Sequence, residues 1–135
     1  MISKMTHTSV LVINQESACD FYTNKLGFKV ITDVPMGADG RWLTVGPPDQ
    51  PGLEIVLSPV AKSMYSKETA DTLSELVKNG TFGVAVFTCE NIFATYEEMK
   101  AKGVEFTKAP KKEFYGTEAI FKDDSGNWFS LAQLN

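Results

Sequence analysis

The sequence is poor in the residues that bind transition metals or attack substrates as nucleophiles. It contains one histidine, His7, and two cysteines, Cys19 and Cys89, which lack the Cys-x-x-Cys spacing of metal and redox sites. Since nothing indicates a secreted chain, we expect both cysteines to be free thiols. A cysteine nucleophile would need a nearby base, and the histidine is predicted on a different element, so packing is the simpler explanation of both thiols.

Long apolar runs and clusters of basic residues are absent as well. No stretch approaches the roughly 20 apolar residues of a membrane-spanning helix, and the first ten residues, MISKMTHTSV, lack a secretory apolar segment. The chain carries 13 Lys and Arg against 17 Asp and Glu, a net charge of −4. We therefore expect a cytoplasmic protein that binds neither nucleic acid nor membrane.

Apolar and aromatic residues are plentiful. Of the 135 residues, 43% are hydrophobic, and they include nine Phe and two Trp. This is enough material for the core of one domain, so we expect residues 1–135 to fold as a single domain.

The main feature of the sequence is an internal repeat. Residues 7–30, HTSVLVINQESACDFYTNKLGFKV, align with residues 83–106, GVAVFTCENIFATYEEMKAKGVEF, at a constant offset of 76 (83 − 7). In each copy an asparagine suited to cap a helix follows an alternating apolar strand, and a glycine suited to end the helix precedes a second strand. Each copy therefore predicts strand, helix and strand, with the first helix over residues 15–26.

β-Forming residues separated by turn signals predict further strands in both copies. The expected strands after the first helix are 28–34, 41–45 and 53–58, with a turn at 35–40, and those of the second copy are 81–88, 104–107, 114–122 and 128–133. A helix over 67–79 links the copies. The chain thus reads as two βαβββ modules, one over about 5–60 and one over about 81–134.

Three segments resemble one known family. They are FYTNKLGFKV at 21–30, GRWLTV at 40–45 and FKDDSGNWFSLAQ at 121–133. In these segments the chain resembles the vicinal oxygen chelate superfamily, which includes glyoxalase I, extradiol dioxygenases and bleomycin-resistance proteins. The resemblance implies an α+β fold of two tandem βαβββ modules, whose curved mixed sheets surround a cavity and carry helices on the outer face. Members close this cavity within one chain or across a dimer; we expect a homodimer, since unpaired strand edges invite association.

Strand alternation indicates which side chains line such a cavity. If Val10 and Val12 face the helix, the alternate side chains of the first and last strands of each copy face the cavity. In the first copy these are His7, Ser9, Leu11, Glu54, Val56 and Ser58, and in the second they are Gly83, Ala85, Phe87, Trp128, Ser130 and Ala132.

The resemblance also implies where a metal would bind. Metal-dependent members take one ligand from the first and one from the last strand of each copy, and here those four positions hold His7, Val56, Gly83 and Ser130. Only the histidine ligates a divalent ion well, whereas a catalytic site normally needs about three protein ligands. We therefore expect no cofactor; the alternative is a divalent metal with His7 and Glu54 as its candidate ligands.

Aromatic residues suggest a different site. Cavity-facing aromatic side chains stack on flat organic ligands, and the candidate ligand-binding residues are His7, Trp42, Glu54, Phe87, Tyr115, Trp128 and Ser130. Our leading hypothesis is a protein that binds a small organic molecule in an aromatic-lined cleft without a full metal site.

The sequence leaves open whether the chain is an enzyme. The first alternative is a divalent-metal-dependent lyase, isomerase or dioxygenase that acts on a vicinal-oxygen substrate through His7. The second is a metal-free enzyme with Glu54 or Glu118 as general base.

Overall fold

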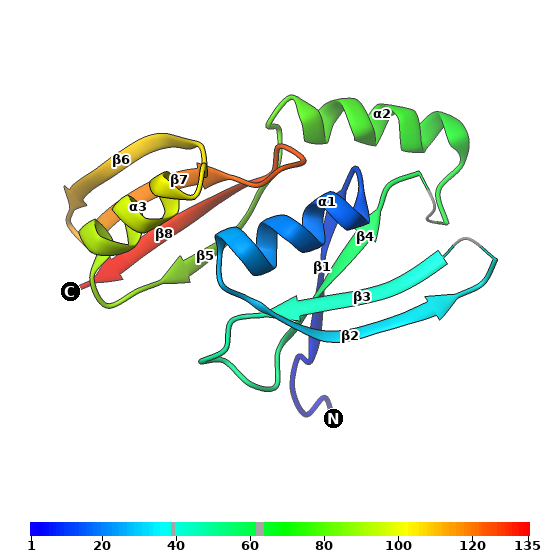
Figure 1. The fold of residues 1–135 in the computed structure, drawn as a ribbon, viewed down its shortest axis with the longest axis horizontal. Helices are drawn as coiled ribbons and strands as arrows, with labels where there is room; N and C mark the ends of the chain where they lie inside the picture. Colours follow the sequence, from blue (N-terminus) through cyan, green and yellow to red (C-terminus); the bar gives the residue numbers. More distant parts are fainter. Residues whose placement is uncertain (39, 62–63) are drawn as a thin grey trace.

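The computed structural model describes residues 1–38, 40–61 and 64–135 and contains two modules joined by a helix (Figure 1). The elements of module 1 are β1 (His7–Val12), α1 (Gln15–Asp20), the π-helical turn η1 (Phe21–Lys25), β2 (Lys29–Met36), β3 (Gly40–Gly46) and β4 (Glu54–Pro59). After the linking helix α2 (Lys67–Lys78), module 2 contains β5 (Gly83–Thr88), α3 (Ile92–Ala101), β6 (Phe106–Glu113), β7 (Gly116–Lys122) and β8 (Trp128–Leu134).

Each module forms one four-stranded mixed sheet. Sheet 1 has the order β1-β4-β3-β2 and sheet 2 the order β5-β8-β7-β6. In both sheets the first and last strands of the module pair in parallel, and the other pairs are antiparallel. The α+β fold of two similar βαβββ modules is therefore confirmed.

The helices begin and end at the predicted signals. The Asn14 side chain accepts a hydrogen bond from the backbone N–H of Ser17 at 2.8 Å, and Asn91 caps α3 in the same way. Gly27 and Gly103 end the two helices with φ angles of +75° and +90°, a backbone region that glycine enters without steric cost. These local signals explain why the helix positions could be read from the sequence.

The strand boundaries of module 2 required correction. The strand expected at 104–107 runs from Phe106 to Glu113, and the next begins at Gly116 instead of residue 114. Proline has no N–H to donate and normally interrupts a strand. Pro110 is tolerated within β6 because this strand lies at the edge of sheet 2. The turn expected at 35–40 is shorter, because Pro35 and Met36 belong to β2 and Gly40 belongs to β3; residue 39 lies outside the described residues.

The helix-covered faces of the two sheets share one core. Tyr22 packs edge-on against Phe129 of β8 with ring centroids 6.3 Å apart, and Phe28 packs against Phe87 of β5 at 5.4 Å. Buried residues of both modules belong to the same cluster, from Val10 and Leu57 in sheet 1 to Phe121 and Leu131 in sheet 2. The opposite face of each sheet, called here its open face, carries most of the strand residues of the sequence-predicted site.

The turn between β7 and β8 fastens module 2 to module 1. Ser125 accepts a hydrogen bond from the backbone N–H of Ile13 at 3.0 Å, and the Asn127 amide donates to the Leu11 carbonyl at 2.8 Å. The Tyr22 hydroxyl donates to the Asp123 carboxylate at 2.7 Å. These bonds fix how the modules sit against each other. Over residues 1–38, 40–61 and 64–135, no helix combines the length and apolarity that crossing a membrane requires.

Candidate functional site

A cavity of about 330 Å³ lies on the open face of sheet 1; we call it the sheet 1 cavity. Its lining residues come from all four strands and from the segment before α2: Ser9, Leu11, Met36, Arg41, Trp42, Val56, Leu57, Ser58, Pro59, Met64 and Tyr65. Most of the wall is apolar, with one indole and two serine hydroxyls. Such a surface suits an organic molecule with few polar groups.

Arg41 is the charged residue of this wall, and its charge is already neutralised. Its Nε and Nη2 donate to the two Asp33 oxygens at 2.8 and 2.9 Å, and its Nη1 donates to Glu16 at 2.9 Å. These partners raise the pKa of Arg41, and the guanidinium lowers the pKa of Asp33. The arginine therefore braces the end of the β2–β3 hairpin and does not present a free cation to a ligand.

His7 and Glu54 form a polar pair next to Trp42. The two residues are direct neighbours in the β1–β4 pairing, and Nε2 of His7 lies 3.1 Å from Oε2 of Glu54. The imidazole ring centroid is 6.1 Å from the Trp42 ring. The Thr44 hydroxyl donates a hydrogen bond to the Glu54 carboxylate at 2.7 Å. This bond makes the largest contribution to the lowered pKa of Glu54. Three predicted site residues are thus brought together on the open face of sheet 1, although of these only Trp42 lines the sheet 1 cavity and the expectation that His7 and Glu54 line it is wrong.

The open face of sheet 2 carries a second group of predicted residues around Glu118. Lys108 Nζ and the Ser130 hydroxyl donate to the two Glu118 oxygens at 2.8 and 2.5 Å. These bonds, together with one from Tyr115, lower the pKa of Glu118 to about 2. A carboxylate this acidic is a poor general base near neutral pH, so Glu118 is disfavoured in that role.

Trp128 lies on the same face, where its indole covers Gly83. A Cβ atom at residue 83 would collide with the Trp128 ring, so only glycine leaves room for the indole there. The Trp128 side chain remains 36% exposed. It is available for contact with another molecule.

Phe87 is placed differently from the prediction. The pairing of β5 with β8 shifts register between Gly83 and Ala85, which moves every later side chain of β5 to the other face. The expectation that Ala85 and Phe87 share the face of Trp128 is therefore wrong, since Ala85 pairs with the core residue Phe129 and the Phe87 ring stacks on Phe129. Val86 takes the open face instead and is 64% exposed.

The structure thus divides the candidates between two surfaces. His7, Trp42 and Glu54 lie on sheet 1, whereas Trp128 and Ser130 lie on sheet 2 and Tyr115 lies in the turn between β6 and β7. Among the described residues, none from sheet 2 lines the sheet 1 cavity, so one chain does not enclose this cavity between its open faces. Sequence reasoning missed Met36, Arg41, Met64 and Tyr65, because strand alternation carries no signal for the hairpin end or for the segment before α2.

The donor set does not suit a catalytic metal. In the part of the chain that the structure describes, no group of three or more His, Cys, Asp or Glu side chains could hold an ion. Of the four positions implied by the resemblance, Val56 is buried and apolar, the Gly83 position lies under an indole, and Ser130 is bonded to Glu118. His7 and Glu54 alone fall short of the usual three ligands.

Comparison with known proteins agrees with the fold. The sequence model of the Glyoxalase/Bleomycin resistance protein/Dioxygenase superfamily matches residues 4–131. The chain belongs to this superfamily. It is 39% identical to YetH of Bacillus subtilis (strain 168), over 98% of this chain and 100% of that protein, and 31% identical to a Shewanella frigidimarina (strain NCIMB 400) protein, over 100% of this chain and 96% of that one.

Two solved structures are close in both sequence and shape. The crystal structure of UcmS2 has a TM-score of 0.93 at 47% identity, with 98% of each chain covered. TnmS3, an antibiotic binding protein from Streptomyces sp. CB03234, has a TM-score of 0.78 at 29% identity, with 99% of this chain and 98% of that chain covered. Of these two structures, the one described as binding a small molecule is TnmS3.

Proposed function

We propose that this protein binds a flat organic molecule in the sheet 1 cavity and does not transform it. The observation that carries the proposal is the Trp42 indole in the wall of a cavity of about 330 Å³ whose other walls are mainly apolar. Flat ligands gain from stacking on an indole and from the loss of water on both surfaces. The antibiotic-binding neighbour TnmS3 supports this class of function.

The proposal includes a homodimer. The sheet 1 cavity is open on one side. The open face of sheet 2 carries Trp128 together with Tyr115 and Glu118, and none of these residues lines the sheet 1 cavity of its own chain. A partner chain that places its sheet 2 over this cavity would supply a second indole and close the site. A cytoplasmic location, and the absence of nucleic-acid and membrane partners and of a cofactor, belong to the same proposal and rest on the acidic net charge and the ligand-poor site.

Ligand screening with paired variants tests the binding site. Aromatic antibiotics and metabolites with vicinal oxygens are screened by thermal shift, and each hit is titrated against Trp42→Ala and Trp128→Ala. Loss of a desolvated aromatic anchor commonly costs about 2 kcal/mol, roughly thirtyfold in affinity. We expect Trp42→Ala to weaken binding by about that factor and Trp128→Ala to weaken it as well. Phe93→Ala, an exposed aromatic on α3, is the control.

A metal-dependent enzyme is the second candidate, and the His7–Glu54 pair favours it. A metal analysis of protein purified without chelator separates the two functions. The binding-only proposal expects no stoichiometric transition metal and little effect of His7→Ala. A hit whose binding needs added metal and His7, but not Trp42 or Trp128, would replace it with the metal-dependent function.

A further inference from the structure

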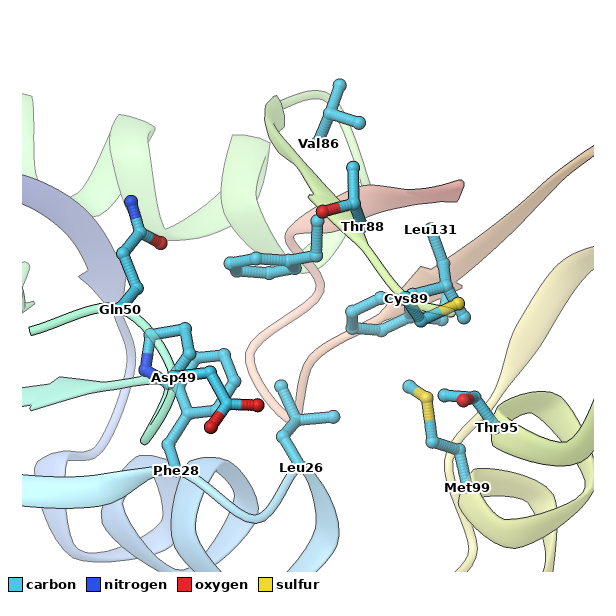
Figure 2. A pocket seen from close by; sticks show the side chains of 13 residues that line it. Leu26, Phe28, Asp49, Gln50, Val86, Thr88, Cys89, Thr95, Met99 and Leu131 are labelled. Carbon is cyan, nitrogen blue, oxygen red and sulfur yellow. The ribbon is translucent and has the colours of Figure 1, made fainter. Parts of the chain in front are cut away.

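A second cavity, distinct from the sheet 1 cavity, lies where the two modules meet; we call it the junction cavity (Figure 2). Its volume is about 530 Å³, and it shares no described lining residue with the sheet 1 cavity. Figure 2 shows module 1 supplying Leu26, Phe28, Asp49 and Gln50 on one side, and module 2 supplying Cys89, Thr95, Met99 and Leu131 on the other. Its lining combines core and helix residues such as Phe87 and Met99 with Val86 of β5, which also lies on the open face of sheet 2.

The walls of the junction cavity are core side chains that the fold leaves partly uncovered. Phe28 and Phe87 meet edge to face at 5.4 Å, and Phe87 stacks on Phe121 at 6.3 Å. Phe28, Phe87 and Leu26 pack against the buried cluster but remain only partly buried themselves. The reversed parity of β5 places Phe87 here. An apolar molecule in this space would cover the exposed ring edges and gain the free energy of apolar burial.

The charged side chain that the described residues contribute to the junction cavity is negative. Asp49 is the single ionisable acid or base that lines it within the described residues, Cys89 aside, and no Lys, Arg or His lines it there. Figure 2 shows the Asp49 side chain reaching from the β3–β4 loop into the space between the modules. Gln50, Thr88 and Thr95 add neutral polar groups to the lining. A carboxylate without a basic neighbour in the lining favours a ligand cation and repels a ligand anion.

We propose that the junction cavity binds an apolar molecule that carries one amine cation. The apolar part lies between Phe28, Phe87 and Leu131, and the ammonium group lies beside Asp49. This site goes beyond the proposed function, because its lining residues are different from those of the sheet 1 cavity. Either site can be disproved without affecting the other.

Alkylation of Cys89 reports occupancy of the junction cavity directly. The Cys89 thiol lines the cavity, whereas Cys19 on α1 lines neither cavity and serves as an internal reference. Burial raises the pKa of both thiols, so labelling with iodoacetamide is run at mildly alkaline pH and read for each cysteine by peptide mass spectrometry. The probes are 4-phenylbutylamine, 4-phenylbutan-1-ol and 4-phenylbutanoate, which differ only in the polar end.

We expect the amine to slow the labelling of Cys89 in a saturable way and to leave Cys19 unchanged. The amine is expected to bind about threefold more tightly than the alcohol, the size typical of an exposed charge pair, and the acid more weakly than either. Asp49→Asn is expected to remove the difference between amine and alcohol while the alcohol still protects. Glu68→Gln, an exposed acid on α2, is the matched control.

Occluding variants and dilution complete the test. Thr88→Trp and Thr95→Trp each place an indole in the lining, and whichever keeps the native circular dichroism spectrum should abolish protection of Cys89 by the amine. Trp42→Ala should leave that protection intact even though it disables the sheet 1 cavity. Lack of protection, equal protection by amine and acid, or protection that depends on protein concentration without any probe would overturn the proposal. The last result would mean that a second copy of the chain fills the junction cavity.

Discussion

At the scale of single residues, Asp123 joins the two modules. Its Oδ1 accepts backbone hydrogen bonds from Ser125, Gly126 and Asn127 at 2.9, 2.9 and 3.0 Å, and its Oδ2 accepts one from the Tyr22 hydroxyl. Tyr22 is fully buried on the η1 turn. Burial, and then the Asp123 charge, raise the pKa of Tyr22 well above its ordinary value, so its hydroxyl stays protonated and donates. One carboxylate therefore orders its own turn and the contact with the other module.

Removing the Tyr22 hydroxyl tests this joint. Tyr22→Phe keeps the ring in the core but takes one donor from a buried carboxylate, a change that costs about 1–3 kcal/mol. We expect the free energy of unfolding, measured in urea, to fall by that amount. Tyr96→Phe is the control, since the Tyr96 hydroxyl makes no hydrogen bond within residues 1–38, 40–61 and 64–135. Equal losses in both variants would contradict the assigned role of Tyr22.

Glu118 gives a pH-dependent prediction. Its pKa is lowered from 4.5 to about 2, first by the Lys108 hydrogen bond and then by Ser130. The folded state therefore holds fewer protons than the unfolded state between these values. Its stabilising contribution is fully present above pH 4.5 and is lost as the pH falls toward 2. Because the side chain is 19% exposed and the lysine partner is solvated, we discount the contribution to about 1 kcal/mol.

Urea unfolding of wild type and Glu118→Gln from pH 7 to pH 3 measures this contribution. The difference in unfolding free energy between the two proteins should narrow as the pH falls below 4.5. Glu68→Gln, whose carboxylate is exposed on α2, should track the wild type. A gap between wild type and Glu118→Gln that stays constant across the range would refute the assignment.

At the scale of elements, β5 shows how a single register shift reassigns a strand. Gly83 corresponds to His7 in the repeat, and the structure keeps this correspondence. Gly83 pairs with Trp128 in sheet 2, as His7 pairs with Glu54 in sheet 1. After the shift, Val86 pairs with Ser130, so the offset between the copies changes from 76 (83 − 7) to 77 (86 − 9). Hydrophobicity could not reveal this change, because Val84, Val86 and Phe87 are apolar on both sides of the strand.

Gly83→Ala tests the packing of Trp128 on β5. The added methyl group collides with the indole, so the ring must move. We expect a loss of about 1–3 kcal/mol in unfolding free energy, the usual cost of overpacking, and a red shift of tryptophan fluorescence.

A double-mutant cycle isolates the indole contact. The same Gly83→Ala change in a Trp128→Leu background should cost much less, because the smaller side chain leaves room for the methyl group. An unchanged cost in that background would show that the backbone at residue 83, and not the indole, requires glycine.

At the scale of the whole molecule, the prediction concerns assembly through the open faces. We expect a homodimer in which the open face of sheet 2 covers the sheet 1 cavity of the partner. Val86→Lys, which places a charge on that face, should shift the mass measured by light scattering from dimer to monomer at micromolar concentration. Val30→Lys, which charges the exposed strand β2, is the matched control and should remain dimeric. A monomeric wild type, or a dimer broken only by Val30→Lys, would contradict this arrangement.

The sequence by itself determined the two modules, the three helices and the face of sheet 1 that carries His7 and Glu54. These features follow from caps, turns and alternation, which act between residues close in the chain. The tertiary structure decided the rest. The register of β5, the fastening of the modules at Asp123 and the two cavities depend on contacts between residues far apart in the chain, such as Gly83 with Trp128, Phe28 with Phe87 and Ile13 with Ser125. No local pattern records such contacts, because each is selected by the packing of the complete core.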